Sequence, residues 1–80
     1  MEIEYADLAL EDLRRIPSKH ADQIIRKIER MRFGLIGDMK ALTNANEGYR
    51  LRSGDYRILF DCDGKTVVIR KVRNRRDAYR

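Results

Sequence analysis

The sequence predicts an α+β fold: a short N-terminal strand, a helical hairpin, a three-stranded antiparallel meander (β-α-α-β-β-β) and a basic C-terminal tail. Two changes in apolar period predict this order. Alternation gives way to helical spacing after residue 5, and alternation returns from residue 49. With 80 residues, of which 42% are hydrophobic and 39% charged, the chain is expected to form a single compact domain over residues 1–80.

The N-terminal half predicts one strand and two helices. Residues 2–5 alternate between Glu and an apolar side chain, which is typical of a strand with one solvated face. Pro17, the only proline, is expected to separate two helices, and Gly34 to end the second near Phe33. The apolar stripe of the first helix is Ala6, Ala9, Leu10 and Leu13; that of the second is Ala21, Ile24, Ile25, Ile28 and Met31.

The C-terminal half predicts three strands. Residues 34–46 have no apolar period and are expected to form a loop. Strand-forming runs follow at residues 49–52, 56–60 and 66–69. Ser53-Gly54 and Asp63-Gly64 are expected to form the two-residue turns between them.

These turns predict a row of arginines. Two-residue turns at both positions place Arg50, Arg57 and Arg70 side by side on the face of the sheet opposite the helices. Like charges directly opposite one another destabilise a sheet, so the row indicates a site for phosphate groups. Two alternatives stay open: the arginines pair with Asp61, Glu47 or an acidic partner, or a bulge shifts the row.

The positive charge lies in the second half of the chain. Residues 1–46 carry eight Lys or Arg and eight Asp or Glu, whereas residues 47–80 carry ten and five, which accounts for the net charge of +5. The last eleven residues alone hold Arg70, Lys71, Arg73, Arg75, Arg76 and Arg80. Such asymmetry is typical of nucleic-acid binding, with an ordinary solvated surface as the alternative.

Composition also excludes several classes of function. A single cysteine, Cys62, and a single histidine, His20, are too few for a disulfide framework or a Cys/His zinc site within one chain. No apolar run is long enough for a transmembrane helix or a signal peptide. We therefore expect a cytoplasmic protein with no cofactor, no metal and no membrane partner.

The second half of the chain resembles a known family. The run from Tyr49 to Phe60 reads YRLRSGDYRILF, and the chain ends in RRDAYR, with Arg75, Arg76 and Tyr79. Together with the strand-helix-helix start and Lys40, these residues resemble the RelE/ParE superfamily of type II toxin–antitoxin toxins. The likeness is greatest to its RelE branch, and it spans essentially the whole chain.

The resemblance implies a ribosome-dependent mRNA endonuclease that needs no cofactor. RelE-type toxins enter the A site of the small ribosomal subunit, cleave the codon there by 2′-hydroxyl attack on the adjacent phosphodiester, and so stop translation. The resemblance also implies three partners: the ribosome, mRNA and a cognate RelB-like antitoxin that wraps the toxin.

Individual roles follow from the same resemblance. It implies that Arg57 and Arg75 stabilise the pentavalent phosphate and that Tyr79 stacks on a codon base or assists proton transfer. Arg50 falls where the family often has a lysine. The predicted catalytic set is Arg57, Arg75, Tyr79 and Arg50, and the predicted nucleic-acid-binding set is Lys40, Arg52, Arg70, Lys71, Arg73, Arg76 and Arg80.

Two departures leave the general base unassigned. A guanidinium stays protonated, so Arg50 is a poor base, and Asn74 stands where several relatives carry a histidine. His20 is expected on the far side of the fold. The base is then Tyr79, Lys71 or a ribosomal group, or catalysis depends on positioning and charge alone.

Other functions stay possible at this point. One is a ParE-like poison of DNA gyrase, which acts by binding protein and carries out no nuclease chemistry. Another is a degenerate toxin that only binds RNA or its antitoxin. The last is a small basic α+β module without either role.

Overall fold

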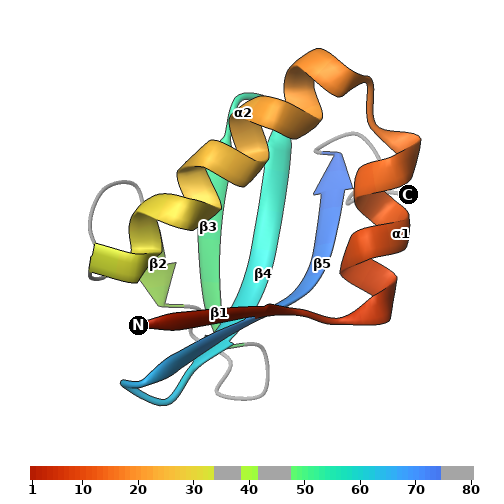
Figure 1. Ribbon diagram of the computed structural model, residues 1–80. Helices are drawn as coiled ribbons and strands as arrows, with labels where there is room; N and C mark the ends of the chain where they lie inside the picture. The colour runs from red at the N-terminus through yellow and green to blue at the C-terminus, as the bar shows by residue number, and fades with distance from the viewer. Residues whose placement is uncertain (34–38, 42–47, 75–80) are drawn as a thin grey trace.

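The computed structural model describes residues 1–33, 39–41 and 48–74. Figure 1 shows a sheet with two helices across one of its faces. The elements are β1 (Glu2–Tyr5), α1 (Asp7–Arg15), α2 (Ser18–Glu29), the 3₁₀ helix η1 (Arg30–Phe33), β2 (Met39–Ala41), β3 (Tyr49–Ser53), β4 (Tyr56–Cys62) and β5 (Thr66–Asn74). The predicted α+β class is confirmed.

The described strands form one five-stranded sheet in the order β1-β5-β4-β3-β2. β1 lies parallel to β5, whereas the other neighbours are antiparallel. β2 is a strand where we expected only loop, because Met39–Ala41 is too short to show a period in the sequence. It pairs with β3 and thereby extends the predicted meander by one strand.

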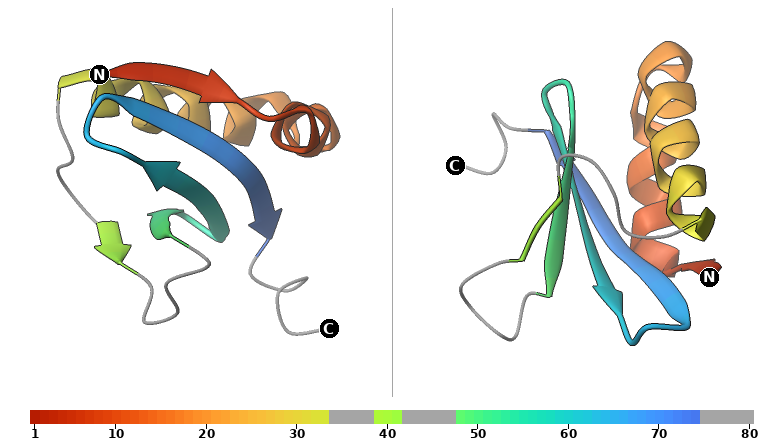
Figure 2. Two further views of the ribbon diagram at one scale, coloured as in Figure 1. Left: turned by 90° about the horizontal axis from the view of Figure 1, so that it is seen from below. Right: turned by 90° about the vertical axis from the view of Figure 1, so that its left-hand side faces the viewer.

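Both helices lie on the same side of the sheet, as Figure 2 shows in its right-hand view. The break at Pro17 is confirmed, since Pro17 caps the start of α2. α2 and η1 bury Ile24, Ile28 and Met31, and these pack with Ile58 and Phe60 from the sheet in one apolar core. The opposite face of the sheet carries no helix among the described residues, and we call it the open face.

The buried stripe of α1 differs from the prediction. Ala9 and Leu13 are buried as expected, but Leu10 is 40% exposed and Asp12 is buried instead. The reason is the position of α1, which packs against β5 at the edge of the sheet, beyond the point where β1 ends. The face of α1 that packs against the sheet is therefore turned away from Leu10 and towards Asp12.

Both predicted hairpin registers are wrong, although the apolar side chains lie on the predicted face of the sheet. Ser53 pairs with Tyr56, so the first two-residue turn is Gly54-Asp55 and not Ser53-Gly54. In the second hairpin the predicted turn at Asp63-Gly64 would pair Phe60 with Val67, whereas the structure pairs Phe60 with Ile69 and Cys62 with Val67. In each hairpin the observed cross-strand partner thus differs by two residues from the partner that the predicted turn implies. Because side chains alternate with period two, a shift of two residues keeps each side chain on the same face, and Ile58, Phe60, Val67 and Ile69 are buried under the helices.

Candidate nucleic-acid interface

The open face carries one row of three arginines. Arg57 in β4 pairs with Arg52 in β3 on one side and with Arg73 in β5 on the other. Their neighbours Leu51, Ile58 and Val72 are buried, so alternation directs the arginines away from the helices. The predicted row of Arg50, Arg57 and Arg70 is therefore wrong in two of its members, while its central residue, Arg57, keeps its place.

A second basic row lies next to the first. Register aligns Lys40, Arg50, Leu59 and Lys71 across β2, β3, β4 and β5. Leu59 is a half-buried apolar side chain between Arg50 and Lys71. For Lys40 the structure describes the backbone, which places it at the end of this row. Strands β3, β4 and β5 thus carry six basic residues (Arg50, Arg52, Arg57, Arg70, Lys71, Arg73) and one acidic residue, Asp61.

Arg70 lies outside both rows because the chain bulges beside it. The pairing of β4 with β5 shifts between Leu59 and Phe60, whose partners are Lys71 and Ile69, so the register passes over Arg70. Its guanidinium lies 3.6 Å from the Asp61 carboxylate, and both side chains are partly exposed. Pairing with Asp61, one of the alternatives left open by the sequence, is thus what the structure contains.

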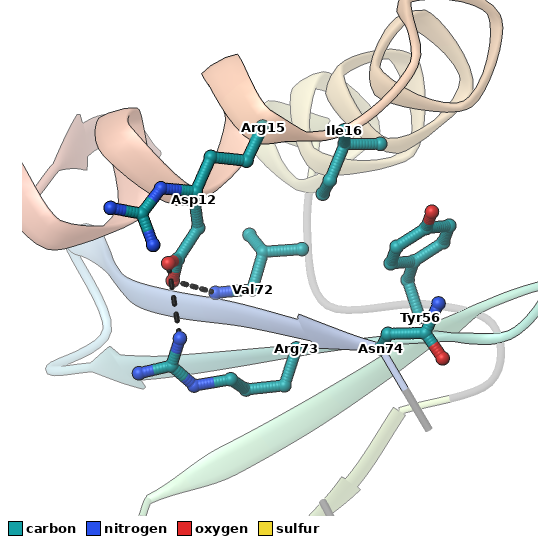
Figure 3. A pocket seen from close by; sticks show the side chains of 7 residues that line it. All are labelled: Asp12, Arg15, Ile16, Tyr56, Val72, Arg73 and Asn74. Carbon is teal, nitrogen blue, oxygen red and sulfur yellow. Dashed lines mark hydrogen bonds and ion pairs between the residues drawn. The ribbon is translucent and has the colours of Figure 1, made fainter. Parts of the chain in front are cut away.

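Arg73 is held by a carboxylate from α1. One Asp12 oxygen, Oδ1, lies 3.0 Å from a terminal nitrogen of Arg73, and the other, Oδ2, accepts the backbone N–H of Val72 at 3.0 Å. Figure 3 shows the carboxylate between α1 and β5 with both contacts as dashed lines. The sequence analysis did not single out Asp12. The available signal was its place three residues after Ala9 and next to Leu13, inside the helical stripe.

Two hollows flank the point where β5 ends. Asp12, Arg73 and Asn74 help to line the first, and His20, Asp55 and Asn74 help to line the second; each has a volume of about 430 Å³. Tyr56 belongs to both. The His20 ring lies 5.8 Å from the Tyr56 ring, on the helix side of the sheet and opposite to Arg57.

The remaining predicted residues lie outside the described part of the chain. They are Arg75, Arg76, Tyr79 and Arg80, together with Glu47, one of the expected acidic partners. In the sequence the first of them, Arg75, directly follows Asn74, the last residue of β5.

The arrangement suits a phosphate-bearing polymer. Guanidinium groups bind phosphate oxygens through paired N–H donors, and two parallel basic rows match an extended charged chain. Leu59 and the aliphatic parts of its neighbours add an apolar surface between the charges. Within the described segments, no three potential metal ligands come together, and no helix has the length and apolar character to cross a membrane.

Sequence comparison assigns the chain to a family of toxins. Residues 3–79 match the family described as the ParE toxin of the type II toxin–antitoxin system parDE. The chain therefore belongs to the ParE/RelE family of type II toxin–antitoxin toxins. The resemblance inferred from the C-terminal motifs is confirmed.

One relative comes from Methanocaldococcus jannaschii. The chain is 29% identical to its toxin RelE3 over 84 residues, which cover 99% of this chain and 96% of the relative. The chain also resembles the crystal structure of the RelB–RelE antitoxin–toxin complex of Methanococcus jannaschii, with a TM-score of 0.81 and 28% identity. That match covers 95% of this chain and 94% of the other.

A more distant structure shares the fold. The isolated RelE toxin of E. coli matches with a TM-score of 0.76 and 18% identity, over 91% of this chain and 82% of that one. At this identity the likeness concerns the fold alone. The strand-helix-helix start and the antiparallel meander are thus those of RelE-like toxins.

Proposed function

We propose that the chain is a ribosome-dependent mRNA endonuclease that cleaves codons in the A site and inhibits translation. The observation that carries the proposal is the row of Arg52, Arg57 and Arg73 on the open face. A row of like charges weakens a sheet unless a polyanion binds it. Relatives named RelE at 28–29% identity agree with this assignment.

In the proposed reaction the 2′-hydroxyl oxygen loses its proton to a base and attacks the adjacent phosphorus, the bond from phosphorus to the 5′-oxygen breaks, and this oxygen takes up a proton and leaves as the 5′-hydroxyl. The other product is a 2′,3′-cyclic phosphate, which water can hydrolyse to a 3′-phosphate. Arg57, between two other arginines, stabilises the negative charge that builds up on the pentavalent phosphate. Arg75 adds to this charge stabilisation, and Tyr79 stacks on the codon base or assists proton transfer. Arg50 supplies charge and no base, because its guanidinium stays protonated.

Lys71 is one candidate for the general base that removes the 2′-hydroxyl proton. Lys71 on β5 is the register partner of Leu59 on β4. Leu59 lies two residues after Arg57 on the same face, so Lys71 is diagonally opposite Arg57. Tyr79 and the ribosome are the other sources. The pH–rate profile of Lys71→Arg tests the first of these groups, since a profile unchanged from that of the wild type excludes Lys71 as the base.

A RelB-like antitoxin is the proposed protein partner. The relative from Methanococcus jannaschii was solved as a RelB–RelE complex. An acidic antitoxin segment over the open face would neutralise Arg50 and Arg57 and exclude RNA. Such binding weakens as salt rises, so an affinity independent of salt would contradict this mode of inhibition.

The test uses purified ribosomes programmed with a defined mRNA. Primer extension should reveal cuts in the A-site codon that require both the ribosome and Arg57. Arg57→Ala should lose cleavage while the protein stays folded, because one positioned charge-stabilising donor contributes on the order of 10²- to 10³-fold in rate. Arg14→Ala is the matched control, since Arg14 is exposed on α1, away from the open face.

Poisoning of DNA gyrase is the second candidate, because the matched family is described by its ParE member. A gyrase poison should inhibit supercoiling by purified gyrase and leave programmed mRNA intact. Intact mRNA together with unaffected supercoiling would favour a degenerate toxin that only binds RNA or antitoxin.

A further inference from the structure

Asp12 is a buried carboxylate that the proposed reaction does not use. It lies in the second turn of α1, and its side chain is 7% exposed. Both of its oxygens are engaged by consecutive residues of β5: one by the backbone of Val72, the other by the side chain of Arg73. Figure 3 shows that no strand lies between the carboxylate and β5 at this point.

The edge of β5 explains the first of these contacts. β1 pairs with β5 only as far as Ile69, and the last link along this edge is the N–H of Ala6, which donates to the Ile69 carbonyl at 2.8 Å. Val72 comes after that point and is 3% exposed, so water cannot readily satisfy its N–H. The Asp12 carboxylate takes the place of a neighbouring strand.

The second contact reaches the open face. Val72 faces the core, so the Arg73 side chain starts on the opposite face, where Arg57 is its register partner. Its guanidinium nevertheless reaches the Asp12 carboxylate at the sheet edge, and the Arg73 side chain as a whole is 41% exposed. A free arginine side chain samples many rotamers, whereas a charge-assisted hydrogen bond to a buried, fixed acceptor selects one of them.

We propose that Asp12 is a positioning residue: its carboxylate fixes the guanidinium of Arg73, the register partner of Arg57, at the edge of the sheet, where a phosphate of the RNA can bind it. The same carboxylate offsets part of the repulsion between Arg73 and Arg57. Asp12 itself touches no substrate and acts through Arg73. The expected effect on cleavage rests on the proposed nuclease function, whereas the contact between Asp12 and Arg73 does not.

The kinetic test compares Asp12→Asn, Arg73→Ala and the double variant on programmed ribosomes. Asparagine keeps an oxygen that can accept the Val72 N–H but has no charge for Arg73, which separates the two contacts. Asp12→Asn and Arg73→Ala should each lower kcat about tenfold, with KM within about twofold, since misplacement of a contributing group affects the rate. The double variant should be no slower than Arg73→Ala, because Asp12 acts only through Arg73.

Glu11→Gln is the matched control for these variants. Glu11 precedes Asp12 on the same helix and pairs with Arg15 at 3.7 Å, but both side chains are largely exposed. Its kcat should equal that of the wild type. A kcat for folded Asp12→Asn within twofold of the wild type, a loss in KM alone, or multiplicative losses in the double variant would each overturn the proposal.

A second readout does not depend on cleavage. NMR should resolve a slowly exchanging Nη–H signal of Arg73 in the wild type and in Glu11→Gln, because a terminal nitrogen is the donor to Asp12, and this signal should be lost in Asp12→Asn. Should the wild type fail to cleave mRNA, the proposed function falls, and the NMR comparison still decides whether Asp12 holds Arg73. An Arg73 signal that is the same in Asp12→Asn as in the wild type would reject the positioning role.

Discussion

Arg57 on β4 and Arg73 on β5 face each other as register partners, and Arg52 faces Arg57 from the other side. Cross-strand pairs of like charge destabilise a sheet by a few tenths of a kcal/mol up to ~1 kcal/mol. Asp12 offsets the charge of Arg73 by a direct contact. The arginine row therefore lowers the stability of the fold when no ligand is bound. Such a loss of stability is expected where a surface is adapted to binding.

Removing Arg52 should stabilise the fold and weaken the toxin. Arg52 is exposed, and its one described side-chain hydrogen bond, to the Gly54 carbonyl, is long at 3.4 Å. Arg52→Gln relieves the repulsion with Arg57, so the melting temperature should rise by about 4 °C. Affinity for RNA should fall and depend less on salt. Arg14→Gln is the control, and a melting temperature below that of the wild type would contradict the electrostatic interpretation.

Arg50 should contribute more to mRNA cleavage than Arg70, although the sequence predicts both in one row. Arg50 lies beside Leu59 in the second row, whereas Arg70 lies at the bulge with its charge offset by Asp61. Cleavage of programmed mRNA should fall on the order of 10²-fold in Arg50→Ala and only a few-fold in Arg70→Ala. Equal losses in the two variants would restore Arg70 to the binding surface.

The sequence predicts which face each residue of the sheet occupies, but not which residues are neighbours. Alternation is a local property of two successive residues, so Arg57 falls on the open face whatever the register. Register depends on the turns, and here the Asp63 side chain accepts the N–H groups of Lys65 and Thr66 while the Asp63 backbone N–H donates to the Thr66 carbonyl, so the turn lies at Gly64-Lys65 and not at Asp63-Gly64. The bulge beside Arg70 then adds a shift that no turn rule contains.

The role of Asp12 could not be read from the sequence for a different reason. Its burial depends on the parallel pairing of β1 with β5, two segments more than sixty residues apart. Only this pairing leaves the edge at Val72 open for α1. The catalytic roles of Arg75 and Tyr79, which lie outside the described residues, remain predictions.

Gly48 should tolerate no side chain. Its φ is +69°, and a Cβ there would lie 2.7 Å from the Phe60 carbonyl oxygen and 2.5 Å from an Asp61 carboxylate oxygen. Gly48→Ala combines backbone strain of about 1–3 kcal/mol with this close approach. The free energy of unfolding, measured in urea, should fall accordingly.

Gly54→Ala is the control for Gly48→Ala. Gly54 also has a positive φ, +58°, but nothing lies within 4 Å of the position that a Cβ would take. It should therefore show the strain without the contact with β4. If both variants lose the same stability, the packing of Gly48 against β4 contributes nothing.

The turn between β4 and β5 should lose stability in acid. The backbone N–H groups of Thr66 and Lys65 donate to the Asp63 carboxylate, both at 2.8 Å, and lower the pKa of Asp63 below its usual value. A carboxyl group whose pKa is lower in the folded than in the unfolded state stabilises the fold fully above the unfolded pKa. This contribution is lost as the pH falls through the folded pKa.

Asp63→Asn isolates this effect, because its amide oxygen accepts the same hydrogen bonds but does not titrate. The difference in melting temperature between the wild type and Asp63→Asn should be constant from pH 7 to about pH 5 and should change in favour of the variant below about pH 4. Carbon-13 NMR of the Asp63 carboxyl group gives the folded pKa directly. A folded pKa at or above the ordinary aspartate value would show that the two N–H groups do not stabilise the charged form, and the position of the turn would then depend on the backbone alone.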